Sequence, residues 1–166
     1  MMEVHIRKVK QGDADTLAYI QTESWKTAFK GIIDAEVLET CTNIDKARLM
    51  YQRLLDDNKG NGYILTVDNK PHCIAYWDKA RDLELASKAE LICIHSLPDN
   101  WHKGFGTKMM DLVLSDIKSS GYSEVVLWVF RDNLRARAFY EAKGFVLNDV
   151  SKAAFDTEEV LYSKFL

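Results

Sequence analysis

The sequence is poor in the features that mark membrane, metal-binding and disulfide-bonded proteins. No apolar run approaches the roughly 20 residues that a membrane-spanning helix needs, and the stretch from Met1 to His5 lacks the apolar core of a signal peptide. Three cysteines, Cys41, Cys73 and Cys93, each stand alone in an apolar segment, which argues against a disulfide framework. The four histidines show no ligand spacing, so we expect no metal. These absences favour a soluble cytoplasmic protein with buried, reduced thiols.

An excess of basic charge is also missing. The chain has 22 Lys and Arg against 25 Asp and Glu, a net charge of −3, and this argues against nucleic acid as a general partner because such binding needs a basic surface. With 166 residues, 47% of them hydrophobic, the chain is long enough for one domain with a full core. We find no repeat, low-complexity segment or linker, and therefore expect a single domain over residues 1–166.

The periodicity of apolar residues predicts a mixed α and β fold. Strands are expected over 4–9, 63–67, 72–77, 89–96, 124–130, 145–150 and 159–165, helices over 13–29, 44–55, 107–120 and 133–144, and a loop over 78–88. The second and third strands read as a hairpin across a polar turn at 68–70. The run 124–130 is apolar almost throughout, as in a strand covered on both faces. It should therefore pair in parallel with 89–96 through a right-handed crossover.

The most informative stretch is 101–110, WHKGFGTKMM, a glycine-bearing loop that runs into a helix. The first N–H groups of a helix lack intrahelical partners, and the helix dipole adds positive charge there. Because Gly104 and Gly106 remove side chains and His102 and Lys103 precede the helix, the loop predicts a phosphate site. The alternative is a loop that needs its glycines only for backbone geometry. A dinucleotide fingerprint is excluded because Met109 stands where a third glycine is needed, and the loop also lacks the Gly-Lys-Ser/Thr of a P-loop.

Two separated blocks resemble the signature of the GNAT N-acetyltransferase superfamily. Residues 98–106, PDNWHKGFG, are similar to its pyrophosphate loop, and residues 133–145, NLRARAFYEAKGF, are similar to its Asn-x-x-Ala-x-x-Phe-Tyr helix. The resemblance implies a mostly antiparallel sheet of about seven strands, with helices on both faces and a parallel strand pair around the cofactor site. It also implies acetyl transfer from acetyl-CoA to a primary amine, by direct attack in a ternary complex. One departure is Trp101, which stands where the family prefers Arg or Gln.

The resemblance assigns the cofactor to the strand end, the loop and the following helix. The residues implied in binding are Ile94, His95, Ser96, His102, Lys103, Gly104, Phe105, Gly106, Thr107, Asn133 and Tyr140. Tyr140 is the expected general acid, since a phenol with a pKa of ~10 is only about 1.5 units above a thiol, and protonating the thiolate costs ~2 kcal/mol. The alternative is that Tyr140 merely packs beside Phe139. The nearby Arg131, Arg135 and Arg137 are interpreted as solvated charges, and the alternative is that one of them contacts the phosphates of the cofactor.

The base is left open between several groups. An amine with a pKa of ~10.4 needs roughly 4 to 5 kcal/mol to become neutral at pH 7. Glu90 is the first candidate, because its distance of 14 residues from Gly104 matches the catalytic glutamate of histone-acetylating relatives. It is equally consistent with a half-buried strand residue. His95 has the better intrinsic pKa but alternates onto the face opposite Glu90 in a regular strand, and a water relay is a third route.

The acceptor is the least determined part. Trp25 and Phe29, in the first helix, are core residues that could also wall a substrate pocket. The acidic residues of 78–90 suit a cationic amine, and we expect a small molecule. The alternatives are a protein or peptide N-acetyltransferase, which would have an open groove, and a non-catalytic acyl-CoA sensor, which would not need Tyr140. A homodimer is an expectation from the family alone.

Overall fold

The computed structural model describes residues 1–166, apart from the side chain of Asn100. The strands are β1 (Val4–Lys8), β2 (Asn61–Val67), β3 (Lys70–Lys79), β4 (Ala89–Ser96), β5 (Glu124–Phe130), β6 (Val146–Ala154) and β7 (Thr157–Phe165). The α-helices are α1 (Ala14–Ala28), α2 (Ala35–Cys41), α3 (Ile44–Asp56), α4 (Phe105–Ser119) and α5 (Leu134–Ala142), and two 3-10 helices are η1 (Leu83–Leu85) and η2 (Pro98–Asn100). Within the described part of the chain, no helix is long and apolar enough to cross a membrane.

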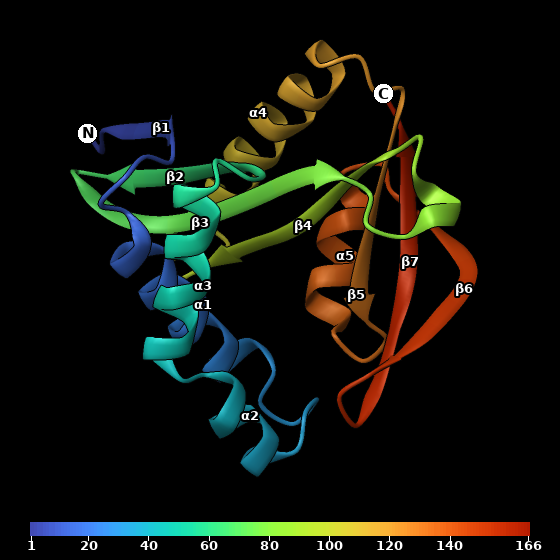
Figure 1. Ribbon diagram of the computed structural model, residues 1–166, viewed down its shortest axis with the longest axis horizontal. Helices are drawn as coiled ribbons and strands as arrows, with labels where there is room; N and C mark the ends of the chain where they lie inside the picture. Colours follow the sequence, from blue (N-terminus) through green and yellow to red (C-terminus); the bar gives the residue numbers. More distant parts are fainter.

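The strands form one seven-stranded sheet in the order β1-β2-β3-β4-β5-β7-β6, in which only β4 and β5 run parallel (Figure 1). The predicted fold class and the parallel pair are therefore confirmed. The β2–β3 hairpin turns at Asp68 and Asn69, whose φ values of 49° and 65° are those of a left-handed two-residue turn.

Helices cover both faces of the sheet, as expected. On one face α4 buries Met109, Met110, Val113 and Ile117 against β3, β4 and β5. On the other face Leu17 and Ile20 of α1 and Tyr51 of α3 pack on Ile64 and Ile74. In Figure 1 α1 and α3 lie side by side, on the opposite side of the strands from α4. The stripe of apolar residues in each helix thus meets an apolar face of the sheet.

Three local predictions need correction. A helix, α2, lies over Ala35–Cys41 where none was expected, and the Asp34 carboxylate caps it by accepting from the N–H groups of Glu36 and Val37. The expected loop 78–88 contains the end of β3 and the short helix η1. The sixth strand extends to Ala154 rather than ending near 150.

The parallel pair is short, and this shapes the site. Only Ala89 with Val125 and Glu90 with Val126 are paired between β4 and β5, so the two strands are joined at their amino-terminal ends alone. Beyond these pairs the carboxyl ends of the two strands have no shared ladder. The sheet therefore opens between β4 and β5 toward the start of α4.

Candidate active site

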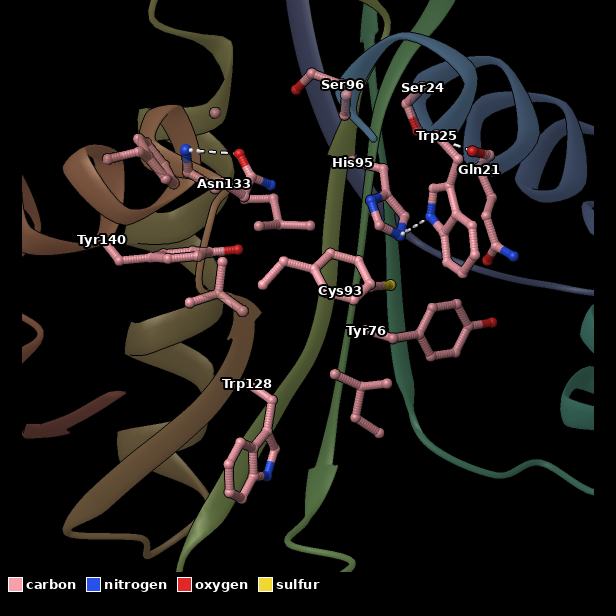
Figure 2. Close-up of a pocket in the computed structure, with 18 of the residues that line it drawn as sticks. Gln21, Ser24, Trp25, Tyr76, Cys93, His95, Ser96, Trp128, Asn133 and Tyr140 are labelled. Carbon is pink, nitrogen blue, oxygen red and sulfur yellow. Dashed lines mark hydrogen bonds between the residues drawn. The ribbon is translucent and has the colours of Figure 1, made fainter. Parts of the chain in front are cut away.

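A cavity of about 1130 Å³ lies where β4 and β5 separate. It is bounded by α1, by the beginning of α4, by α5 and by the ends of both strands. Figure 2 shows side chains from α1, from α5 and from the strands facing one another across the opening. Twelve of the residues predicted for the site line it: Trp25, Phe29, Ile94, His95, Ser96, His102, Gly104, Phe105, Gly106, Thr107, Asn133 and Tyr140. Lys103 and Glu90, also predicted, do not line this cavity.

The predicted phosphate turn is built by the backbone. Gly104 precedes α4 with a φ of 82°, a left-handed conformation that side chains disfavour, and the space beside it is free to 4 Å. Gly104 offers no side chain as a cap, so the N–H groups of Phe105, Gly106 and Thr107 in the first turn are available to an anion. Phe105 itself is buried and anchors the turn. The residues present therefore fit a diphosphate bound through backbone N–H groups.

Trp101, the departure from the family pattern, connects the end of β4 to α5. Its indole Nε1–H donates to the carbonyl oxygen of Ser96 at 3.0 Å. The Arg135 guanidinium lies over the indole ring, 3.6 Å from its centroid, as a cation–π pair. Burial lowers the pKa of Arg135, which nevertheless stays cationic. Arg135 is exposed, as its interpretation as a solvated charge implies, but its guanidinium is held over the Trp101 ring at the cavity wall.

Tyr140 combines packing with access to the cavity. Its ring contacts Phe139, Phe145 and Tyr162 at centroid distances of 5.6, 5.9 and 6.5 Å. Its hydroxyl nevertheless points into the opening, on the side of Cys93 (Figure 2). Burial, more than any neighbouring charge, raises the pKa of the Tyr140 phenol well above 10. The hydroxyl is thus a proton carrier that stays protonated at neutral pH.

Asn133 stands at the junction of β5 and α5. It is buried, and its Oδ1 caps α5 by accepting from the N–H of Ala136 at 3.2 Å. Figure 2 shows its Nδ2 on the side of the cavity, so one amide serves the helix while its other end remains a donor for a ligand.

Glu90 is engaged elsewhere, contrary to its predicted place in the pocket. The residue is 1% exposed, and its Oε1 accepts from the N–H and Nε of Arg81 at 3.1 and 3.2 Å. Its Oε2 accepts from Nη2 of the same arginine. Both carboxylate oxygens are thus used by Arg81 and Glu90 does not line the cavity, so the geometry does not support Glu90 as the base.

His95 lies on the same face of the sheet as Glu90, against the prediction of opposite faces. In the β3–β4 ladder Tyr76 pairs with Cys93 and Trp77 pairs with Leu91, so Ile92 is an extra residue. Such a β-bulge reverses the alternation beyond it. Cys93 and His95 consequently face α1, where the Trp25 indole Nε1–H donates to His95 Nε2 at 3.1 Å (Figure 2).

The lining of the cavity is rich in aromatic side chains and includes a carboxylate, that of Glu159. Trp25 and Phe29 line it as predicted, and Phe29 also packs edge-on against Phe130 at 4.9 Å. Trp128 and Glu159, which the sequence did not single out, also line the cavity. Burial raises the pKa of the Glu159 carboxyl. Strand alternation could have indicated Trp128 and Phe130 as neighbours on one face, but nothing local points to Glu159.

The side chains that could bind a metal are dispersed over the described part of the chain. Among the residues that the structure describes, no group of three or more His, Cys, Asp or Glu side chains is placed to hold a metal ion. The three thiols are free: Cys73 is buried, whereas Cys41 and Cys93 are partly exposed. Burial raises the pKa of Cys93, which borders the cavity, to about 12, so this thiol is uncharged.

Comparison with known proteins agrees with this geometry. The model of the acetyltransferase (GNAT) family matches residues 25–145. A spermidine N(1)-acetyltransferase of Thermoplasma acidophilum is 26% identical over 160 residues, which cover 95% of this chain and 98% of that protein. The crystal structure of PaiA N-acetyltransferase from the same organism, in complex with coenzyme A, superposes with a TM-score of 0.84 at 23% identity over 99% of both chains. A GCN5-related N-acetyltransferase from Rhodopseudomonas palustris gives a TM-score of 0.80 at 16% identity, covering 100% of this chain and 98% of the other.

Proposed function

The chain belongs to the acetyltransferase (GNAT) family, and from this premise we propose that it transfers an acetyl group from acetyl-CoA to a primary amine of a small, cationic molecule. The observation that carries the proposal is the meeting, in one cavity, of a backbone anion turn at Gly104 and a protonated hydroxyl at Tyr140. The turn can bind the diphosphate of the cofactor, and the hydroxyl can protonate the departing thiolate. The proposed cofactor residues are those of the strand end, the turn and α5 that line the cavity. Lys103 is exposed and does not line the cavity.

Tyr140 is proposed to hold and deliver one proton. Acetyl-CoA supplies an acetyl group that is activated as a thioester. Because burial raises the pKa of Tyr140, its hydroxyl stays protonated until a stronger base, such as a thiolate, forms beside it. The cation of Arg135 lies near enough to offset part of that rise. Direct attack of the amine in a ternary complex fits a cavity that places the turn and the α1 wall on either side of Tyr140.

The acceptor is proposed to be a di- or polyamine, because the part of the cavity around Trp128 can hold a cation. Trp128 already carries one, since the Lys152 ammonium lies 4.1 Å from the centroid of its ring. Lys152 and Glu159 are paired across β6 and β7, which brings a carboxylate beside this cation. An acceptor with a second ammonium can use the same ring and carboxylate. The spermidine substrate named for the Thermoplasma relative has this chemistry.

The first test is ligand-dependent stability followed by turnover. Acetyl-CoA at 100 times its Kd should stabilise the protein by about 2.7 kcal/mol, which for a chain of this size raises Tm by roughly 5 to 11 °C. NAD and ATP should give no such shift. A panel of monoamines, diamines, spermidine, aminoglycosides and lysine peptides, followed by release of free thiol, then identifies the acceptor. Absence of a shift at millimolar acetyl-CoA refutes the proposal, and a shift without turnover on any amine indicates a sensor.

A Glu159→Gln variant tests the acceptor class. We expect its KM for a diamine to rise about 10-fold, with the KM for a monoamine of equal length nearly unchanged, since about 1.4 kcal/mol of charge attraction corresponds to a factor of ten. Equal effects on both amines would refute the role of Glu159. Preference for lysine peptides over all small amines would instead favour a protein acetyltransferase.

A further inference from the structure

The hydrogen bond between Trp25 and His95 fixes where the imidazole carries its proton. An indole Nε1–H can only donate, so His95 Nε2, 3.1 Å away, must present its lone pair. A neutral imidazole has one proton, which therefore sits on Nδ1. The two rings meet at 75° with centroids 6.0 Å apart, so the contact has a defined orientation. Because the Trp25 indole has no acceptor atom, its hydrogen bond selects one of the two neutral tautomers of His95.

The imidazole of His95 is also expected to be neutral, as the Nδ1–H tautomer requires. A proton on Nε2 would set one N–H against the N–H of Trp25. Burial also lowers the pKa of His95 to about 4, with no acidic partner among the causes. His95 is thus a neutral group at physiological pH, with its donor fixed on Nδ1.

The Nδ1 side of the ring faces the reaction space. Figure 2 shows this nitrogen turned away from Trp25, toward the side of the cavity that holds Asn133 and Tyr140. The bulge at Ile92 is what turns His95 to this face. A lone pair aimed into the cavity would suit a general base. A fixed N–H aimed there suits an oxygen that gains negative charge.

Resting on the proposed acetyl transfer, we infer that His95 is a hydrogen-bond donor to the acyl carbonyl oxygen, and that Trp25 is the positioning residue that holds its Nδ1–H tautomer. His95 keeps its proton throughout the reaction. The amine nitrogen adds to the acetyl carbon, negative charge collects on the carbonyl oxygen, and the carbon–sulfur bond then breaks as that charge returns to the carbonyl. Tyr140 protonates the departing sulfur and regains a proton from solvent, and solvent takes the proton that the amine nitrogen loses. The stabilisation comes from the N–H···O bond, which strengthens as charge develops on oxygen.

The first experiment reads the tautomer directly, without substrate. In ¹⁵N-histidine-labelled protein at pH 7, His95 should show a protonated Nδ1 and an unprotonated Nε2, with the resonance assigned by its loss in His95→Asn. Trp25→Phe removes the indole N–H but keeps an aromatic ring, and should bring back a substantial Nε2–H population. Phe29→Leu, which changes a ring 5.1 Å from Trp25, is the packing control and should leave the tautomer as in the wild type. A wild-type Nε2–H tautomer, or an unchanged tautomer in Trp25→Phe, overturns the inference.

Turnover then separates a donor from a base. His95→Leu should lower kcat by roughly 10²- to 10³-fold, the loss typical of one donor to a developing oxyanion. His95→Asn keeps an N–H donor near the place of Nδ1 and should recover most of that loss. An amide cannot take up a proton, so an Asn variant as inactive as the Leu variant would assign His95 as the base and refute the donor role. If the wild-type protein acetylates no amine, the proposed function fails, and the NMR result still decides whether Trp25 fixes the tautomer.

Discussion

Replacing Arg81 by methionine should destabilise the protein markedly, because it leaves a buried carboxylate with few partners. Breaking a buried ion pair on one side costs about 3 to 5 kcal/mol. The Arg81 side chain is 61% exposed while that of Glu90 is 2% exposed, so water screens one end of the pair. The N–H of Arg81 also remains a donor in the variant. We therefore expect a loss of about 2 to 3 kcal/mol.

The size of this effect can be measured in two ways. In a chain of this length each kcal/mol changes Tm by roughly 2 to 4 °C, so Tm should fall by about 4 to 12 °C. Urea unfolding should show a lower midpoint with an unchanged m-value. In a double-mutant cycle, Glu90→Gln combined with Arg81→Met should cost at least ~1 kcal/mol less than the sum of the single losses.

The same variants decide what Glu90 does. If it stabilises the β3–β4 region and lies outside the cavity, Glu90→Gln should leave kcat within about 3-fold of the wild type after correction for the folded fraction. Additive single losses would refute the ion-pair argument. A 100-fold fall in kcat in a fully stable Glu90→Gln protein would restore Glu90 as the base.

Three further predictions concern the cavity. Tyr140→Phe should lower kcat by about 100-fold and leave the acetyl-CoA-induced rise in Tm unchanged, and equal turnover would remove Tyr140 as the acid. Gly104→Ala meets no atom within 4 Å but adopts a φ of 82°, so it should cost about 1 to 2 kcal/mol in urea unfolding and weaken acetyl-CoA binding, whereas an unstrained, tight-binding variant would refute the backbone turn. The His95 pKa of about 4 lies below the unfolded value of 6.5, so the unfolded state binds more protons between these pH values and stability should rise with pH across that window by at most about 3 kcal/mol. His95→Asn should flatten that rise in urea titrations at pH 4.5, 5.5 and 7, and identical slopes would contradict the shift.

The parts of the site that could be predicted from sequence are those set by local chemistry. The glycine at 104 before an apolar helix can be predicted, as can a cap at Asp132 or Asn133, because each acts through its own backbone or through the next turn. The parallel pair of β4 and β5 followed from an apolar strand after a helix, since the crossover rule restricts the topology. The family motif added Tyr140, whose role no spacing rule gives.

The parts that could not be predicted depend on long-range contacts or on one-residue irregularities. No residue type in the sequence indicates the bulge at Ile92, yet the bulge places His95 on the face of the sheet that carries Glu90 and is covered by α1. The partner of Glu90 is nine residues away, in a segment that was expected to be only a loop. Trp101 was seen as a departure from a motif, but its contacts with Ser96 and Arg135 appear only when η2 and α5 are folded together.

The two-pair junction between β4 and β5 has a consequence for how the molecule holds together. The sheet is a pair of half-sheets, β1 to β4 and β5 to β7, that share few interstrand bonds and are held together mainly by the side chains of α4 that pack on both halves. A chain-like ligand with amide groups, lying in the gap, would bridge the halves by main-chain hydrogen bonds in the manner of an added strand. Amide exchange should then slow together in β4 and β5 when such a ligand binds, as two loosely coupled units become one.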